Sequence, residues 1–401
     1  MIEICSIEDC TACQACFNAC RNNAISFEPD SIGNLYPIIN QVNCINCGIC
    51  KKVCPVNNPP QLYSCKKSYV GCANDENEQK TSTSGGIAAA ISRFVVRKGG
   101  VVYGCTAIDP FFIHHIRVDH EHSLQKIKGS KYVQSRIDNI YTQVLFDLKE
   151  KKTVFFVGTP CQIAGLKGFL RHEYDNLFTA DFVCHGVASQ KLFSESLKLS
   201  FKNQNIGQDC YIHFRFKNAK GNTNYGMFVQ DKKGNTLLKE KYPENDYILG
   251  FLKGIFYRSN CYSCKYACPE RVADITLGDY RDDEKMFTMI PHYKLGLSKV
   301  LVNTHKGEYL LNECSCELVL KPISIEQIIL TGGQLIHPMP KHKESDRFIR
   351  LYQAYGISIA FKEILPLIKS KARRTLRIRR FINFIYSFPL VKQIIYFFRK
   401  K

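Results

Sequence analysis

Apolar runs alternate with helical patterns through the middle of this 401-residue chain. Strands are predicted at 100–108, 153–157 and 177–183, with helices at 136–151, 162–171 and 190–201 and another opening at Ser84-Gly85-Gly86. Such alternation favours a largely parallel sheet with helices on its faces. Beyond residue 210, the stretches YIHFRFKN and YGMFVQDKKGNTLLKEKY flank Gly-Asn turns and predict an antiparallel section, followed by strands at 274–280 and 299–304.

Positive charge is concentrated at one end of the chain. The net charge is +19, and residues 341–401 hold 16 Lys and Arg against three acidic residues, which gives 16 − 3 = +13. The rest of the chain is only mildly basic, so a uniformly basic nucleic-acid-binding protein is not indicated. A basic tail that contacts a separate partner fits better.

The amino-terminal segment repeats one cysteine motif. C-x2-C-x2-C-x3-C begins at Cys10 and again at Cys44. In this motif three cysteines bind irons of one 4Fe-4S cluster and the fourth ligates the other cluster. The spacing predicts two 4Fe-4S clusters, one held by Cys10, Cys13, Cys16 and Cys54 and the other by Cys44, Cys47, Cys50 and Cys20. Zinc knuckles or disulfides are the alternatives, but zinc ribbons use a different, two-pair spacing.

The chain has 20 cysteines, and its first residues, MIEICSIEDC, show no leader pattern. These features indicate a reducing, cytoplasmic compartment. Cys5 is predicted to lie on a first strand as a small buried residue.

Further cysteines occur in the middle of the chain. Cys161 and Cys184 each follow a predicted strand, and ligands of open parallel sheets gather beyond the carboxyl ends of the strands. The loop CYSCKYAC adds a C-x2-C pair. The hypothesis is a third 4Fe-4S cluster on Cys161, Cys184, Cys261 and Cys264, with Cys268 as a substitute ligand. Two alternatives stay open: buried thiols beside a zinc or dithiol loop, or Cys161 as a nucleophile with His185 as its base.

Clusters transfer single electrons, whereas most metabolites accept electron pairs as hydride. A flavin converts between the two, so a cluster-rich α/β chain suggests one. TSTSGGIAAAISRF places hydroxyls and glycines at a helix start, where a phosphate is favoured, although the same residues also make an ordinary helix cap. No GxGxxG is present, so a Rossmann dinucleotide fold is not supported.

Five stretches carry a resemblance to a known family: SGGIAAAI, KGSKYVQS, VFFVGTPCQIAGLKGFL, NLFTADFVCHGVASQ and CYSCKYACPERVADITLGDY. In this order they resemble the coenzyme F-420 hydrogenase/dehydrogenase beta subunit family over residues 65–320, while residues 1–58 resemble a two-cluster bacterial ferredoxin. The resemblance implies FAD next to a 4Fe-4S cluster, with hydride exchange at the flavin. It implies flavin contacts at Ser84, Gly85, Gly86, Ser130, Lys131 and Tyr132, with Thr159 and Gln162 facing the ring.

The predicted organisation is α+β. It has a ferredoxin-type 2×(4Fe-4S) domain at 1–60, an α/β flavin-binding body in two parts, 65–150 and 151–335, and a helical basic tail at 340–401. The predicted function is an iron-sulfur flavoprotein oxidoreductase that transfers hydride to or from an organic substrate, either deazaflavin-like or from a polysaccharide pathway. The alternative is a non-catalytic electron-transfer subunit. A redox partner protein or a small-molecule acceptor is expected, and no nucleic acid.

Three smaller features complete the predictions. The apolar segment 381–398, interrupted by Pro389 and flanked by basic residues, is predicted to lie on the inner membrane face, with docking on another subunit as the alternative. The histidines of HHIRVDHEH, 114–122, are predicted to form a solvated hairpin rather than a metal site. Arg271, Asp274 and Asp279 either orient the cluster loop through ion pairs or have a plain structural role.

Overall fold

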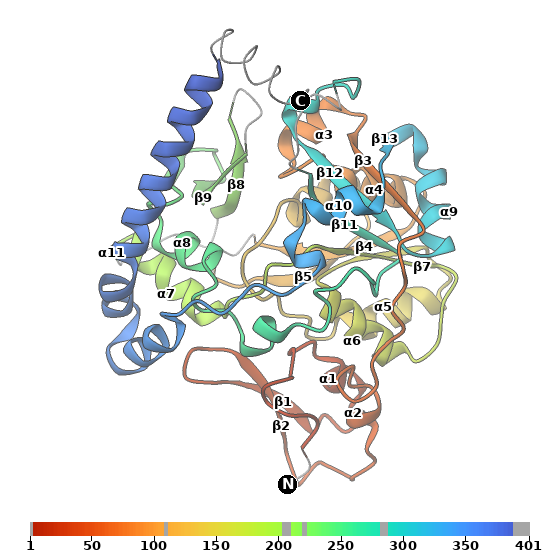
Figure 1. The fold of residues 1–401 in the computed structure, drawn as a ribbon. Coiled ribbons are helices and arrows are strands. Elements are labelled where there is room, and N and C mark those ends of the chain that lie inside the picture. The colour runs from red at the N-terminus through yellow and green to blue at the C-terminus, as the bar shows by residue number, and fades with distance from the viewer. Residues whose placement is uncertain (1–2, 108–110, 203–209, 219–222, 281–287, 388–401) are drawn as a thin grey trace.

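The structure, a computed structural model, describes residues 3–107, 111–202, 210–218, 223–280 and 288–387. A mixed eight-stranded sheet lies at the centre of the body (Figure 1), in the order β13-β3-β12-β11-β7-β6-β4-β5. Its strands are β3 (Lys67–Ala73), β4 (Val101–Thr106), β5 (His114–Val118), β6 (Val154–Val157), β7 (Leu177–Phe182), β11 (Ile275–Tyr280), β12 (Leu297–Val302) and β13 (Leu318–Pro322).

Only the centre of this sheet is parallel. Strands β4, β6, β7 and β11 run parallel, whereas β5 on one side and β12, β3 and β13 on the other pair antiparallel. The prediction of a mostly parallel sheet is therefore correct for the centre and wrong for the flanks. Between β4 and β5 the reason is the connection: it spans 107–113, and a parallel crossover needs a dozen or more residues.

Helices cover both faces of the sheet. On one face, α5 (Ile140–Lys149) and α6 (Pro160–Leu170) share an apolar core with Val101, Tyr103 and Phe156. On the other face, α4 (Ile87–Arg97) and α9 (His305–Glu313) pack with Val102 and Phe155. Because successive strand residues point to opposite faces, a strand buried on both reads as the continuous apolar run seen in the sequence.

A separate antiparallel sheet has the order β10-β9-β8 and matches the predicted hairpins. It consists of β8 (Cys210–Lys217), β9 (Thr223–Asp231) and β10 (Thr236–Lys241), and it packs with α7 (Gln190–Ser200), α8 (Asp246–Leu252) and the long α11 (Ser345–Ser387). Helix α11 runs along one side of the molecule (Figure 1) and is kinked at Gly356, where φ is 80°. Two short helices, α3 (Glu76–Thr81) and α10 (Ile325–Leu330), flank the main sheet.

The amino-terminal segment forms α1 (Ala15–Ala19), a β1–β2 hairpin (Ile25–Pro29 and Leu35–Ile39) and α2 (Ile49–Lys52). It lies below α5 and α6 in Figure 1. Gln14 Oε1 accepts from the backbone N–H groups of Ile137 (2.6 Å) and Asp138 (3.0 Å), and Gln134 Nε2 donates to Thr11 O (2.9 Å). The segment is thus fixed to the body by direct hydrogen bonds.

Helix α6 approaches this segment through two glycines. An ideal Cβ on Gly165 would lie 2.9 Å from Cys13 Sγ, and one on Gly168 would lie 2.4 Å from Val53 O. These distances leave no room for a side chain at either glycine, so the backbone of α6 lies directly against Cys13 and Val53.

Cys5 and the basic tail lie near the two ends of the chain. Cys5 lies on a bend rather than a strand and is half-buried. Helix α11 covers the start of the predicted tail segment, while residues 388–398 lie outside the described residues. None of the helices within the described ranges is long and apolar enough to cross a membrane.

Candidate functional site

The cysteines of the amino-terminal segment form two groups. The first, here called the inner set, is Cys10, Cys13, Cys16 and Cys54, all buried and all lining one small cavity. Cys5 lines the same cavity, and its thiol is in hydrogen-bonding contact with Cys10 and Cys54. These contacts lower the pKa of Cys10 to about 6 and that of Cys54 to about 7. The sequence interpretation of Cys5 as an apolar residue missed this role.

The second group, the outer set, is Cys44, Cys47, Cys50 and Cys20. Burial raises the pKa of Cys50, and the neighbouring Cys47 and Cys44 act in the same direction. Cys20 and Cys50 pack on the same apolar cluster, while Cys47 is exposed. The outer set is therefore half-buried and reaches solvent through Cys47, whereas the inner set is buried.

Four cysteines of the body, the body set, come from three places in the sequence. Cys161 lies in the first turn of α6, Cys184 follows β7, and Cys261 and Cys264 lie on and just after a 3-10 turn at Ser259–Ser263. Strands β6 and β7 are hydrogen-bonded neighbours, which brings their carboxyl ends together. The Cys268 thiol contacts the backbone oxygens of Lys265 (3.5 Å) and Glu270 (3.2 Å), and burial raises its pKa, with a smaller contribution from the neighbouring Cys264.

The body-set thiols are close enough to influence one another. Burial raises the pKa of Cys161 to about 11 and of Cys261 to about 12, and it raises that of Cys184 well above its usual value. Repulsion by Cys261, Cys161 and Cys264 adds to the effect at Cys184. Four thiols this close together repel one another once they are thiolates. They therefore ionise together only around a cationic centre.

A capping box at the start of α6 positions Cys161. The Thr159 backbone N–H donates to Gln162 Oε1 (3.0 Å), and the Thr159 side chain accepts from the Gln162 backbone. Pro160 occupies the first turn, where its missing N–H costs nothing. Thr159 Oγ1 lies 3.1 Å from Cys161 Sγ, so the local sequence TPCQ fixes the direction of the thiol.

A cavity of about 610 Å³ opens beside the body set. Cys161 and Cys184 lie in its wall, together with seven of the eight residues predicted to contact a flavin: Ser84, Gly86, Ser130, Lys131, Tyr132, Thr159 and Gln162. Gly85 is the exception. Its N–H donates to Ser298 Oγ (2.9 Å), and a Cβ there would lie 2.5 Å from Gly71 O, so its small size serves packing against β3.

One end of the cavity has the features of an anion site. Helix α4 begins after Gly86, whose φ of 84° is left-handed, and no side chain caps it. The first-turn residues Ile87, Ala88 and Ala89 line the cavity. Uncapped backbone amides at a helix start, added to the helix dipole, favour a phosphate.

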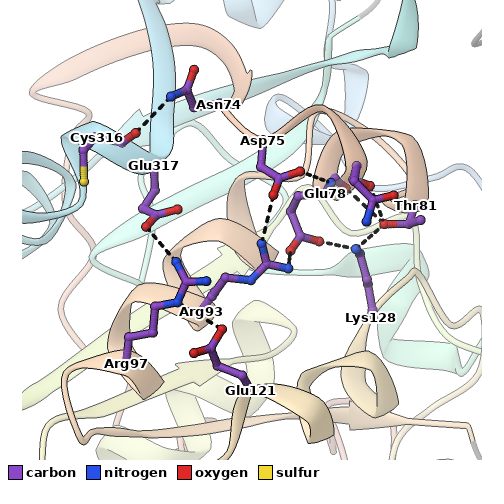
Figure 2. Close-up of polar contacts among 11 residues, drawn as sticks. Asn74, Asp75, Glu78, Thr81, Arg93, Arg97, Glu121, Lys128, Cys316 and Glu317 are labelled. Carbon is purple, nitrogen blue, oxygen red and sulfur yellow. Dashed lines mark hydrogen bonds and ion pairs between the residues drawn. The ribbon is translucent and has the colours of Figure 1, made fainter.

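Charged side chains border this end of the cavity. Figure 2 shows Arg93 and Lys128 both directed at Glu78, which is buried. Arg93 also contacts Asp75 (3.5 Å), and Lys128 contacts Thr81. Glu78, Arg93 and Lys128 all line the cavity, so two cations are held near the start of α4 by one carboxylate.

His115 is a wall residue that the sequence interpretation missed. It is 3% exposed, its Nε2 donates to Val157 O (3.0 Å), and its Nδ1 accepts from Ser135 Oγ (2.5 Å). Burial lowers its pKa to about 4. The prediction of a solvated hairpin is wrong at this position because His115 stacks on Phe156, with 5.3 Å between the ring centres. The alternation in HHIRV groups His115 with Arg117 and not with the apolar Ile116 and Val118, so no local signal marked His115 as buried.

The ion pair behind the cluster loop differs from the predicted one. Arg271 pairs with Asp181 (3.2 Å) and donates to the backbone oxygens of Tyr266 (2.7 Å) and Cys268 (3.2 Å). Asp274 instead bonds Thr179 and Thr304, and Asp279 pairs with Arg215 (2.7 Å). Of the three predicted residues, only Arg271 touches the loop.

Within the described ranges, no three His, Cys, Asp or Glu side chains are placed to hold one metal ion. A 4Fe-4S cluster does not require such convergence. Each cysteine ligates a different iron, so the four thiolates surround the cluster instead of meeting at a point.

The fold and the cysteine motifs define an iron-sulfur protein with an α/β body. Residues 9–58 match the model of the 4Fe-4S dicluster domain, and residues 151–327 match that of the carboxyl-terminal part of the coenzyme F420 hydrogenase/dehydrogenase beta subunit. These two matches confirm the resemblance seen in the sequence: the chain carries a 4Fe-4S dicluster domain, and its body is similar to the carboxyl-terminal part of that beta subunit.

The chain is similar to two known proteins. It is 22% identical over 356 residues to the coenzyme F420-dependent sulfite reductase of Methanocaldococcus jannaschii, covering 86% of this chain and 52% of that protein. The chain thus spans about half the length of this curated relative. A chain of the F420-reducing [NiFe] hydrogenase complex from Methanosarcina barkeri aligns with a TM-score of 0.47 and 16% identity, covering 74% of this chain and 95% of that one.

Proposed function

We propose that this protein is an iron-sulfur flavoprotein oxidoreductase that exchanges electrons between three 4Fe-4S clusters and FAD. The observation that carries the proposal is the shared wall of the 610 Å³ cavity, in which Cys161 and Cys184 lie beside seven predicted flavin contacts. A cavity of this size falls within the range of cofactor sites.

The residues fit the cofactors in chemical terms. The inner, outer and body sets each supply four thiolates, the ligand number of a 4Fe-4S cluster. The start of α4, with Lys128 and Arg93 nearby, would hold the diphosphate. Ser130, Lys131 and Tyr132 would line the isoalloxazine ring. Bound there, the flavin would supply conversion between single electrons and hydride, in which two electrons and one proton equal one hydride.

The arrangement of the three sets supports one order of electron transfer. The outer set reaches solvent through Cys47, and the inner set is buried. Helix α6 joins the inner set to the body set, since Cys13 lies against Gly165 and Cys161 is in the first turn of the same helix. Tyr266 lies within electrostatic reach of Cys161 and Cys264 on one side and of Cys13 and Cys54 on the other. Electrons would pass from the outer set to the inner set, then to the body set and the cavity, or in reverse.

Metal and flavin analysis of anaerobically purified protein tests the proposal. We expect about twelve irons and matching sulfide per chain, together with one FAD. About eight irons per chain would contradict the body cluster. Purified protein without flavin would contradict the assignment of the cavity as the FAD site. Cys268→Ser is the matched control because Cys268 lies outside the proposed four ligands and its thiol is bonded to backbone oxygens, so its iron content should equal the wild-type value.

The proposed hydride partner is a deazaflavin, because the sulfite reductase relative is described as coenzyme F420-dependent. A polysaccharide-pathway substrate is the second choice. Reduction of a deazaflavin by the purified protein with reduced ferredoxin as donor would support catalysis. If electrons reach only a partner protein and no small acceptor, the chain is a non-catalytic electron-transfer subunit.

We also propose that the carboxyl-terminal part of α11 contacts an anionic membrane surface. Among the described residues after Glu363 there are seven basic and no acidic side chains, and Arg374, Arg377 and Arg380 have no ion pair there. The exposed apolar residues Leu367, Ile378, Phe381 and Ile382 lie on the same stretch. Basic and apolar side chains together favour the interface of an anionic bilayer.

Vesicle sedimentation tests this contact. We expect the protein to pellet with vesicles that contain phosphatidylserine and to stay in the supernatant with phosphatidylcholine alone. The triple variant Arg374→Ser, Arg377→Ser, Arg380→Ser should lose the binding without loss of fold, because these side chains are exposed. Equal binding to both kinds of vesicle, or none, contradicts the proposal and favours docking on another subunit.

A further inference from the structure

Arg258 lies where the amino-terminal segment meets the body. Its exposed fraction is 0%, although it carries a charge that is rarely buried without a partner. Nε donates to Cys10 O (2.7 Å) and Nη1 to Leu35 O (2.9 Å), and the guanidinium lies 4.2 Å from the centre of the Tyr36 ring. All three contacts belong to the amino-terminal segment, whereas the arginine belongs to the body.

The backbone of Arg258 is fixed to the body set. Its N–H donates to Val187 O (2.9 Å), three residues after Cys184, and its carbonyl accepts from Cys261 N (2.9 Å). The side chain therefore points from the body-set loop toward the inner set. Arg258 is thus hydrogen-bonded both to the segment that carries the inner set and to the loops that carry the body set.

The charge of Arg258 acts on thiols of both sets. At Cys10 its effect adds to the larger one of Cys5 in lowering the pKa. At Cys161 and Cys261, where burial raises the pKa, Arg258 acts in the opposite direction. Among the described residues no carboxylate forms an ion pair with Arg258, whose side chain instead contacts backbone oxygens and the Tyr36 ring and lies in the field of the nearby thiols.

One nitrogen of Arg258 has no acceptor. Nη2 is buried and makes no hydrogen bond in the part of the chain that the structure describes. A buried N–H without a partner is destabilising, and more so when it is charged. Such an atom is expected to face a group that binds there, and hydrogen bonds to cluster sulfur are one way in which proteins set cluster potentials.

We propose that Arg258 is a cation shared by the inner and body cluster sites, with Nη2 donating to cluster sulfur, and that it raises the reduction potentials of both clusters. The physical reason is charge: reduction adds one electron, and a fixed positive charge in a buried environment stabilises the more negative state. A shared cation shifts both potentials in the same direction, which keeps neighbouring clusters matched. This inference rests on the proposed function, because the body cluster is part of it.

Redox titration of the full-length protein, followed by electron paramagnetic resonance, tests the role of Arg258. In Arg258→Gln we expect the inner and body clusters to shift to more negative potential and the outer cluster to keep its wild-type value. Arg258→Lys keeps the charge but loses the fork of donors, so it should give a smaller shift of the same sign. Arg97→Gln is the matched control, because Arg97 is exposed and pairs with Glu121 and Glu317 on the surface (Figure 2); all three potentials should stay unchanged.

The outcomes separate this inference from the proposed function. Twelve irons with unshifted inner and body potentials in Arg258→Gln would overturn the inference alone. About eight irons in the wild-type protein would overturn the body cluster, and with it the shared role. If Arg258→Gln loses its clusters, Arg258→Lys decides: wild-type potentials there would contradict the donation to sulfur. A shift of the outer cluster as large as the others would show a general change of structure instead.

Discussion

At the scale of single residues, Cys161 is one of two thiols, with Cys184, that belong both to the body set and to the wall of the cavity. Cys161→Ser removes one proposed ligand while the Thr159–Gln162 cap stays in place. We expect a loss of about four of twelve irons, with the signals of the inner and outer clusters unchanged. Iron analysis with low-temperature electron paramagnetic resonance measures both. Loss of all clusters would mean that the chain is unfolded rather than short of one ligand.

His115 predicts a pH dependence of stability. Its pKa is lowered to about 4 in the folded chain by burial, against about 6.5 in the unfolded chain. Between these values the unfolded state binds a proton that the folded state does not, so stability is complete above pH 6.5 and falls as the pH drops toward 4, by up to about 3 kcal/mol.

Thermal unfolding of His115→Gln and wild type at pH 7 and pH 5 measures this effect. The variant should start less stable, because the bonds to Val157 and Ser135 are altered, yet lose less stability on acidification. His120→Gln, on the surface, is the control and should follow the wild type. A variant that loses as much as wild type would assign the acid sensitivity to other groups.

At the scale of elements, α6 connects the cluster sites through glycine. In Gly165→Ala the new Cβ would lie 2.7 Å from Cys13 Cβ. Overpacking costs roughly 1–3 kcal/mol, and it outweighs the roughly 1 kcal/mol that alanine adds to a helix interior because both Cβ atoms are attached to backbone. We expect the inner cluster to be lost or altered first, with the outer cluster as an internal control. An unchanged inner-cluster spectrum would show that α1 and α6 can separate at no cost.

The elements also show what the sequence can predict. The strands at β4, β6, β7 and β11 and the helices between them follow from apolar periodicity, since each is buried against neighbours of its own region. The antiparallel flanks could not be predicted, because β3 pairs with β12 and β13 from more than 200 residues away. Likewise, the spacing of cysteines identified each loop, but Arg258 contacts distant backbone and Asp181 contacts the distant Arg271 side chain, and no local pattern encodes either contact.

At the scale of the whole molecule, the outer set, with its exposed Cys47, and the cavity lie at opposite ends of the proposed electron route. Cys47→Ser removes a ligand from the outer set. We expect a loss of about four irons, a wild-type flavin content, and loss of flavin reduction by a reduced ferredoxin. Stopped-flow absorbance under anaerobic conditions follows the flavin. Reduction at the wild-type rate would show that electrons enter at another surface.

The contact of Cys13 with Gly165 also has a consequence for biogenesis. The inner thiols are enclosed once the amino-terminal segment rests on α6, since each of the four is 7–8% exposed, whereas Cys47 stays open to solvent. Iron and sulfide must then be delivered to the inner site before the two parts close on each other, and the outer site can be filled afterwards. Maturation of this protein is therefore expected to be ordered, and a chain that closes too early would be trapped with only its outer cluster replaceable.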